Sequence, residues 1–329
     1  MADIQKYFEK FHELIRVDYD MRQDLAEKRD IVVERIERHL KEKALPTPRM
    51  LLQGSYRMGT GVKPTGDLEY DIDIGLRFDF SPGAHAADEA RRWIYEAVEG
   101  HTNRCEDKGP CVRVVYEAGF HLDLVTYCVW EDSPGHENYR LAHKAKGWLA
   151  ADPPALLEHV RKCRALFENT EDAATQTDQL RRVVRYLRRW SDVRIPREDE
   201  GKPTGLAFVL LCCSRLAPAH FLDLRPDDRL AMAALVADIS GPGTRISAEK
   251  PTPEYEDVFA CLTDAKMDEL IADLRSLADA LKKAEQTADP IEACRMMQRY
   301  FGEDFPVPEP EDTAKRTKAP AIITSSSSA

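Results

Sequence analysis

The feature that most constrains this chain is a pair of aspartates in an apolar strand pattern, preceded by a glycine and a serine. The segment Leu51-Leu52-Gln53-Gly54-Ser55 is followed, after a loop, by Glu69-Tyr70-Asp71-Ile72-Asp73-Ile74-Gly75-Leu76. Side chains alternate between the two faces of a strand, so Asp71 and Asp73 point the same way, about 7 Å apart. The residues between and beside them can face a core: Tyr70, Ile72 and Ile74.

The chemistry of these residues indicates a site for a metal ion and a phosphate. Two carboxylates on one face repel each other. A hard divalent cation, which prefers oxygen ligands, offsets this repulsion when it binds between them. The turn at Gly54 and Ser55 offers backbone N–H groups and a hydroxyl, which suit phosphate oxygens. A phosphate beside a metal site is typical of nucleotide chemistry.

A third acid lies in a second apolar strand pattern, Phe120-His121-Leu122-Asp123-Leu124-Val125. Alternation places Asp123 on one face with His121 and Val125. An isolated aspartate of this kind is more often a strand-edge charge or a cap. If this strand lies beside the Asp71 strand, however, three carboxylates converge and can hold two Mg²⁺ ions. One ion then orients a triphosphate, and the other activates an attacking hydroxyl. We favour this interpretation because the Gly-Ser turn and the aspartate pair accompany Asp123.

An arginine-rich helix pattern follows at Leu180–Trp190. Its apolar stripe (Leu180, Val183, Val184, Leu187 and Trp190) runs beside a basic stripe of Arg181, Arg185 and Arg188. Arginine forks suit phosphate oxygens, but most such stripes are solvated faces. We expect Arg181, Arg182 and Arg189 to be solvated. For Arg185 and Arg188 both interpretations stay open.

Periodicity predicts a mixed α/β first half and a helical second half. Residues 4–43 form one long helix or two, and a helix spans about His85–Glu99. Strands are expected at Met50–Gln53, Leu68–Phe78, Val112–Glu117 and Phe120–Tyr127. Six helices follow after residue 150, at 154–167, 177–190, 204–216, 229–239, 266–286 and 291–301. The proline- and serine-rich residues 306–329 are expected to be a disordered tail.

Composition narrows the classes of partner. The net charge of −11 argues against binding long nucleic acid, but not against small nucleotides. No apolar run approaches the roughly 20 residues of a membrane helix, and the N-terminus lacks a secretory signal, so we expect a cytoplasmic protein. We also expect the protein to be a monomer. The eight cysteines form no CxxC pair and are expected to be reduced thiols. A zinc fragment at His101, Cys105 and Cys111 is disfavoured by its spacing.

At these residues the chain resembles a known family. Gly54, Ser55, Asp71, Asp73 and Asp123 match the metal-site pattern of the DNA polymerase β-like nucleotidyltransferases. The lobe order resembles more specifically that of the bacterial CD-NTases, the cGAS/DncV-like enzymes that make cyclic oligonucleotide signals in anti-phage (CBASS) defence. Three segments strengthen this resemblance, namely 143–153, 186–190 and 300–306.

The resemblance implies an α+β fold of three parts. Residues 1–150 would form a polymerase β-like nucleotidyltransferase lobe, with a mixed sheet, flanking helices and a long bracing N-terminal helix. Residues 151–305 would form an all-helical, oligoadenylate-synthase-like lobe, and residues 306–329 the tail. It also implies that ATP, GTP or other NTPs are joined sequentially with release of pyrophosphate.

The resemblance also assigns the site residues and partners. The metal ligands would be Asp71, Asp73 and Asp123, holding two Mg²⁺ ions for which Mn²⁺ can substitute. The nucleotide-binding residues would be Gln53, Gly54, Ser55, Arg185, Arg188 and Thr204. Relatives often have a lysine where Arg188 stands, and Thr204 is interpreted first as the N-cap of the helix after Pro203. Some relatives are conjugated through their C-terminus by ubiquitin-like conjugation enzymes, so Ala329 is a candidate site for such conjugation.

Two other functions compete with a cyclic oligonucleotide synthase. One is a different nucleotidyltransferase, which makes linear oligonucleotides or modifies a small molecule or an RNA end. The other is a catalytically silent nucleotide-binding scaffold. Three mutually repelling acids kept without a metal would be costly, which argues against the scaffold. The bases, the linkage and the ring size of a product are not encoded in any motif that we recognise.

Overall fold

A computed structural model describes residues 3–17, 19–66, 70–117, 119–196, 198–243 and 245–310 of the 329-residue chain. Two parts of the sequence predictions lie outside these ranges: the start of the Leu68–Phe78 strand, and residues 311–329 of the tail with Ala329. Within the described ranges, no helix is both long enough and apolar enough to cross a membrane.

The centre of the first half is a parallel pair of strands, β2 (Tyr70–Asp79) and β5 (Phe120–Ser133). Between them the chain forms α4 (Ala87–Val98), β3 (Arg104–Asp107) and β4 (Val112–Tyr116). This long connection is what a parallel pair requires.

The other strands extend this pair into a mixed, seven-stranded sheet. The order β1-β2-β5-β4-β3 includes β1 (Arg49–Leu52), which is antiparallel to β2. The distal half of β5 pairs instead with β6 (His136–His143), which pairs with β7 (Gly147–Ala151). The predicted mixed sheet is confirmed.

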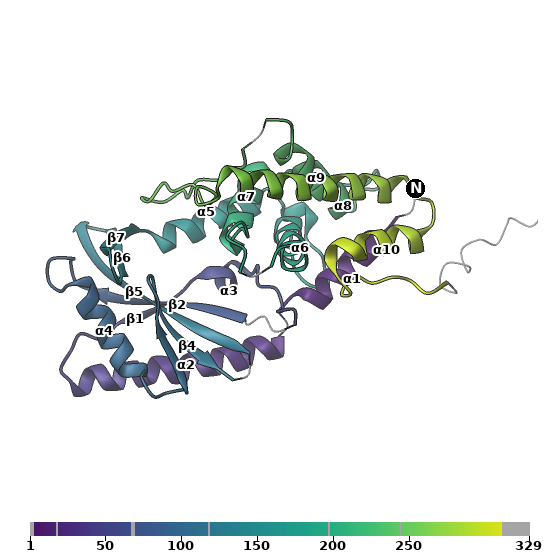
Figure 1. The fold of residues 1–329 in the computed structure, drawn as a ribbon. Coiled ribbons are helices and arrows are strands. Elements are labelled where there is room, and N and C mark those ends of the chain that lie inside the picture. The colour runs from purple at the N-terminus through teal and green to yellow at the C-terminus, as the bar shows by residue number, and fades with distance from the viewer. Residues whose placement is uncertain are drawn as a thin grey trace, which may run out of the picture.

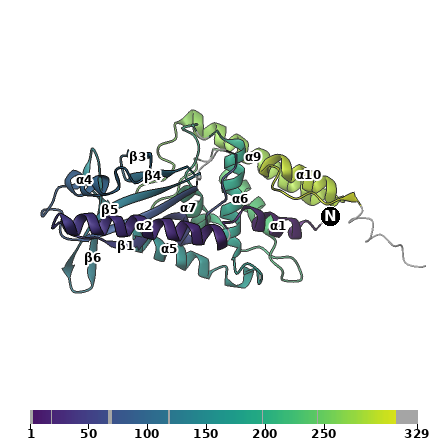
Figure 2. The same cartoon turned by 90° about the horizontal axis from the view of Figure 1, so that it is seen from below.

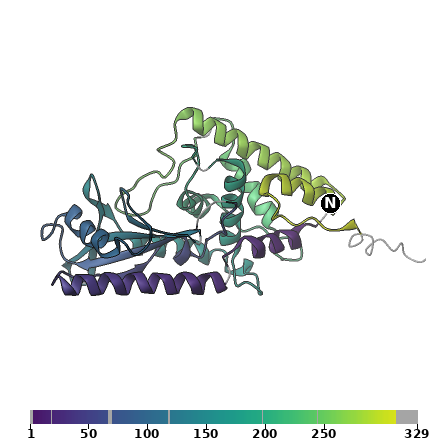
Figure 3. The same cartoon turned by 60° about the horizontal axis from the view of Figure 1, so that its bottom comes forward.

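Two helices cover one face of this sheet, because alternate strand residues are apolar. The long α2 (Tyr19–Glu42) runs beneath the sheet beside α4 (Figures 1 and 3). The buried side chains between these layers include Ile36 from α2, Trp93 from α4, and Ile72, Ile74, Leu122 and Leu124 from the central strands. The aspartates of β2 therefore point to the opposite face, as alternation predicted.

The second half is helical, as predicted. Its elements are α5 (Pro153–Ala165), η1 (Glu168–Thr170), α6 (Gln179–Arg194), α7 (Gly205–Arg215), α8 (Asp228–Ile239), α9 (Asp264–Gln286) and α10 (Pro290–Phe301). A side chain caps the N-terminus of each α-helix in this set, namely Asp152, Asp178, Thr204, Asp227, Thr263 and Asp289. Short polar caps satisfy free N–H groups, so the sequence locates these helix starts well.

The N-terminal pattern resolves into two helices that serve different parts of the fold. The first, α1 (Gln5–Ile15), extends away from α2 toward α10 (Figure 2). Its Phe8 and Phe11 pack against the rings of Tyr186, Phe301 and Phe305 in the helical core. The N-terminal segment thus connects both halves of the chain.

Three structural predictions need correction. β3, β6, β7 and the short α3 (Gly54–Met58) were not predicted, because their alternation is brief or interrupted by polar residues. Arg182 and Arg189 are buried rather than solvated, and Arg181 is half-buried. The start of the predicted tail, residues 306–308, packs near the helical core, where Val307 contacts the apolar cluster and Phe305 is fully buried.

Candidate active site

The register of β2 against β5 brings the three predicted acids together. Asp73 lies opposite Asp123, and Asp71 lies opposite His121. All four side chains belong to the sheet face that α2 and α4 leave open. The expectation that the Asp123 strand lies beside the Asp71 strand is therefore confirmed.

Gly54 brings the phosphate-type turn into contact with this acidic face. Its φ of 65° is in the left-handed region, which favours glycine. A Cβ atom at this position would lie 1.9 Å from the Oδ2 atom of Asp73. No side chain other than hydrogen fits there. The turn that begins α3 thus packs its backbone directly on the carboxylate of Asp73.

Burial and repulsion from neighbouring carboxylates change the pKa of Asp73. Asp73 is enclosed, and the charges of Asp123 and Asp71 add to the effect of burial, so its pKa rises to about 6. Burial also acts on Asp71, but the hydrogen bond and charge of His121 outweigh it and hold the pKa of Asp71 below its usual value. The Nε2 atom of His121 lies 2.7 Å from Oδ1 of Asp71.

Asp123 is held by an arginine from the neighbouring strand. The Nε and Nη2 atoms of Arg113 in β4 each donate to a different oxygen of Asp123, at 2.7 Å. Burial opposes the charge on Arg113, but the paired carboxylate raises its pKa above the usual value. Arg113 thus supplies positive charge beside the acids. No sequence signal marked Arg113, since it stands alone in an apolar strand.

The donor set fits a hard divalent cation. Asp71, Asp73 and Asp123 offer only carboxylate oxygens, the ligand type that Mg²⁺ prefers. Burial, followed by the charges of Asp123 and Asp71, raises the pKa of Asp73, and a bound cation would relieve the repulsion among these acids. Each oxygen bound by Arg113 keeps a further lone pair for another ligand.

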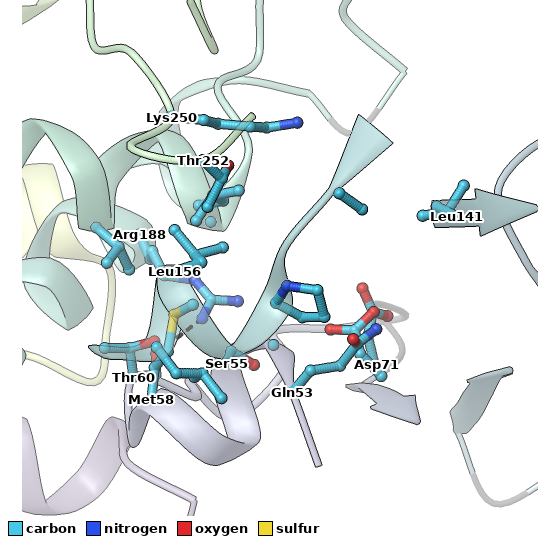
Figure 4. A pocket seen from close by; sticks show the side chains of 18 of the residues that line it. Gln53, Ser55, Met58, Thr60, Asp71, Leu141, Leu156, Arg188, Lys250 and Thr252 are labelled. Atoms are coloured by element: carbon cyan, nitrogen blue, oxygen red, sulfur yellow. Dashed lines mark hydrogen bonds between the residues drawn. The ribbon is translucent and has the colours of Figure 1, made fainter. Parts of the chain in front are cut away.

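Two of the three acids, Asp71 and Asp73, line a cleft of about 520 Å³ between the two halves of the chain. Gln53, Ser55 and Asp71 lie on one side, while Lys250 and Thr252 lie across the opening (Figure 4). Asp73 and Gly54 also line it, and Gln53 accepts a hydrogen bond from the hydroxyl of Tyr127 at 3.0 Å. The volume is within the roughly 300–1,000 Å³ typical of small-ligand sites.

The arginines of α6 mainly hold the loop that follows α3. Arg185 donates to the carbonyls of Gly59 and Gly61, and Arg188 donates to the carbonyl of Thr60 at 2.7 Å. Arg189 donates to the carbonyl of Lys63 at 2.8 Å. This loop lies between the Gly-Ser turn and β2. By holding this loop, these guanidinium groups help to position the Gly-Ser turn.

Arg185 and Arg188 differ in their access to the cleft. Arg185 is 2% exposed, does not line the cleft, and also contacts Nε2 of His12 at 2.7 Å. Arg188 lines the cleft, where its guanidinium extends toward Ser55 (Figure 4). Of the two arginines, only Arg188 has a position from which it can contact a ligand there.

Buried Arg182 and Arg189 have anionic partners that sequence periodicity could not show. Arg182 binds Asp228 on α8 through two hydrogen bonds of 2.7 and 2.8 Å, and Arg189 pairs with Asp304. Half-buried Arg181 pairs with the helix cap Asp178. Asp228 and Asp304 are far from α6 along the chain, whereas Asp178 is its N-cap. Helical periodicity reports the angle of a side chain about its own helix, not what packs over it.

Thr204 and His143 have structural roles. The hydroxyl of Thr204 accepts from the N–H of Ala207 at 3.2 Å, which confirms the N-cap, and Thr204 does not line the cleft. His143 lies at the end of β6, where its Nδ1 accepts from the backbone of Ala145 and Lys146.

Several cleft residues of the helical half carry no sequence signal. They include Asp192 and Lys202, with Lys250, Thr252 and Glu254 from the loop before α9. They come from separate loops and helices without regular spacing, so no pattern could join them.

The fold and the acid cluster together define a polymerase β-like nucleotidyltransferase architecture. Residues 48–127 match the family described as cyclic GMP-AMP synthase DncV-like, nucleotidyltransferase domain. Over these residues the chain is similar to the DncV-like nucleotidyltransferases, in agreement with the sequence resemblance.

Solved structures show the same fold over most of the chain. The DncV cyclic AMP-GMP synthase of Vibrio cholerae superposes with a TM-score of 0.73 at 16% identity, covering 93% of this chain and 98% of that one. DncV of Escherichia coli, with 3'-deoxy GTP bound, gives 0.71 at 16% identity, covering 88% and 93%. The α+β class with a helical second half is therefore confirmed.

Two curated proteins are similar over part of their length. A c-di-GMP synthase of Roseivirga ehrenbergii is 34% identical over 177 residues, which cover 48% of this chain and 46% of the relative. A cyclic GMP-AMP synthase of Escherichia albertii is 24% identical over 217 residues, covering 63% and 45%. The chain thus spans just under half the length of each of these relatives.

Proposed function

We propose that this chain is a cyclic oligonucleotide synthase that joins NTPs, ATP or GTP or both, into a cyclic di- or trinucleotide and releases pyrophosphate. The observation that carries the proposal is the contact of the Gly54 turn with Asp73, which itself lies opposite Asp123 at the edge of the cleft. A triphosphate on the turn would place its reacting phosphate beside the acids. The names of the relatives support cyclic dinucleotides as products.

Each group of residues has a separate task in this proposal. Asp71, Asp73 and Asp123 would hold two Mg²⁺ ions, or Mn²⁺ in their place. The bound ions would neutralise the triphosphate and lower the pKa of the attacking hydroxyl. Gly54 and Ser55 would orient the donor phosphates through backbone N–H groups and the hydroxyl. Arg188 lines the cleft from the helical side and would contact phosphate oxygens there.

The reaction is an in-line displacement repeated at one site. The acceptor hydroxyl forms a bond to the α-phosphorus of the donor as the bond to pyrophosphate breaks, and the hydroxyl proton is lost to water or to a carboxylate. The first cycle gives a linear dinucleotide with a 5'-triphosphate. A later cycle uses that triphosphate as donor and closes the ring. The V. cholerae enzyme has been solved with such a linear intermediate, pppA(3',5')pG.

Product analysis tests this proposal. The protein is incubated with labelled NTPs and Mg²⁺ or Mn²⁺, treated with phosphatase, and the products are resolved. We expect phosphatase-resistant cyclic species, and a loss of at least ~100-fold in rate for Asp73→Asn, which removes one carboxylate ligand. Linear products would establish a different nucleotidyltransferase. Full activity of Asp73→Asn would refute the site assignment.

The cellular role is a separate part of the proposal. We infer a role in anti-phage defence, with residues 1–150 as the nucleotidyltransferase lobe, residues 151–305 as the helical lobe, and a monomeric active form. The support is the family resemblance. Conjugation at Ala329 is tested by intact-mass measurement of protein from cells with the complete operon, compared with a chain lacking its last residues. Absence of an adduct on the full-length chain would refute conjugation.

A further inference from the structure

A histidine and two cysteines converge outside the cleft, where α5 packs against α7. His159 and Cys163 are one helical turn apart on α5, so they share a face of that helix. Cys213 comes from the last turns of α7. The Nε2 atom of His159 and the Sγ atoms of both cysteines all lie within 4.8 Å of one another. No sequence motif marks this group, because Cys213 is distant along the chain.

The spacing of these atoms is close to that of a tetrahedral metal site. With Zn–S bonds of about 2.3 Å and Zn–N bonds of about 2.0 Å, neighbouring ligand atoms lie about 3.5–3.8 Å apart. The Nε2 atom of His159 is 3.5 Å from Sγ of Cys163. The other two separations among the three ligand atoms are at most 4.8 Å, which exceeds this range by no more than about 1 Å. Small side-chain rotations would therefore complete the arrangement.

The surroundings allow an ion to enter and be neutralised. All three side chains are half-buried, so the group is reachable from solvent. Binding a divalent metal would release two thiol protons and leave a neutral centre.

We propose that His159, Cys163 and Cys213 form a Zn²⁺ site, with the fourth position taken by water, that fastens α5 to α7. Sulfur and imidazole ligands select zinc over Mg²⁺, so this site is chemically distinct from the carboxylates of the cleft. The N-terminal ends of both helices line the cleft, at Pro153 and Leu156 of α5 and at Gly205 and Leu206 of α7. The ion would hold together the opposite ends of these helices.

Cobalt substitution tests the site with the full-length chain. The reduced, chelator-treated protein is titrated with Co²⁺ in excess Mg²⁺, which occupies the carboxylate site. We expect one Co²⁺ per chain with the thiolate-to-cobalt charge-transfer band and the visible bands of tetrahedral cobalt. Zn²⁺ should displace the cobalt. At a free Zn²⁺ concentration ~100 times its Kd, the Tm should rise by about 4 °C.

Variants separate this site from other thiols. Cys163→Ser, Cys213→Ser and His159→Gln should each weaken Co²⁺ binding by at least ~10-fold, as expected for the loss of one ligand, and abolish the Tm rise. Cys261→Ser is the matched control, since Cys261 is exposed and outside the group. It should bind Co²⁺ as the wild type does.

Three results would overturn the proposal. The first is a wild-type cobalt complex without the thiolate band. The second is a band that persists in both Cys163→Ser and Cys213→Ser. The third is a disulfide between Cys163 and Cys213 in the isolated protein whose reduction does not restore metal binding. The last result would instead assign the cysteine pair to redox chemistry. None of these measurements depends on catalytic turnover.

Discussion

Replacing Gly54 by alanine should disable the site while leaving the fold nearly intact. The added Cβ would lie 1.9 Å from Oδ2 of Asp73, and also 2.7 Å from Cγ and 2.9 Å from Cβ of the same residue. Real Cβ atoms essentially never approach other heavy atoms closer than 3.0 Å. The carboxylate oxygen or the turn must therefore move by about 1.1 Å, the difference between the two distances. A displacement of about 1 Å in a reacting geometry can cost ~100-fold in rate.

The cost in stability should be much smaller than the cost in rate. Alanine in the left-handed region costs about 1 kcal/mol or slightly more, which corresponds to a Tm decrease of about 2 °C for a chain of this size. Gly100→Ala is the matched control. Gly100 has a φ of 72°, and nothing lies within 4 Å of its added Cβ. Both variants carry the same backbone strain, but only Gly54→Ala displaces a carboxylate.

The assay compares kcat for pyrophosphate release and Tm in the two variants. We expect similar Tm decreases, with a ~100-fold loss of kcat for Gly54→Ala and near wild-type kcat for Gly100→Ala. Gly54→Ala activity within a few-fold of wild type would refute the role given to this contact. Equal losses of activity in both variants would show that backbone strain, not the displaced carboxylate, is responsible.

Three further predictions concern charge and metal. Mn²⁺ at ~100 times its Kd should stabilise the wild type by about 2.7 kcal/mol, measured by Tm and reversed by chelation. It should stabilise Asp73→Asn far less, and equal stabilisation of the two proteins would exclude Asp73 as a ligand. Burial and then the charge of Arg185 lower the pKa of His12 to about 2, so its stabilising effect is complete above the unfolded pKa of 6.5 and is lost as the pH falls. Wild type should therefore lose about 2 kcal/mol more than His12→Gln between pH 6.5 and pH 5 in denaturant titrations, and parallel losses would contradict this. Arg185→Ala should cost about 3 kcal/mol of stability because it leaves buried carbonyls unpaired. Arg188→Ala should mainly raise KM for NTP, and the opposite pattern would reverse the roles assigned to these two arginines.

Much of this protein follows from local sequence. Strand alternation alone places Asp71 and Asp73 on one face and Ile72 and Ile74 on the other, because the side-chain period of a strand is two. Helix starts such as Thr204 are also local, because a cap and the N–H group it binds are three residues apart. The Gly-Ser turn and the acids could thus be recognised without coordinates.

Tertiary structure decided the features that depend on distant partners. Arg185 and Arg188 lie one turn apart on α6, yet Arg185 is buried against His12 while Arg188 reaches the cleft. The pairing of Arg113 with Asp123 and the approach of Cys213 to Cys163 likewise depend on how strands and helices pack. Sequence periodicity fixes the direction of a side chain from its own backbone. Only packing decides which charge, carbonyl or thiol it meets, because that partner belongs to another element.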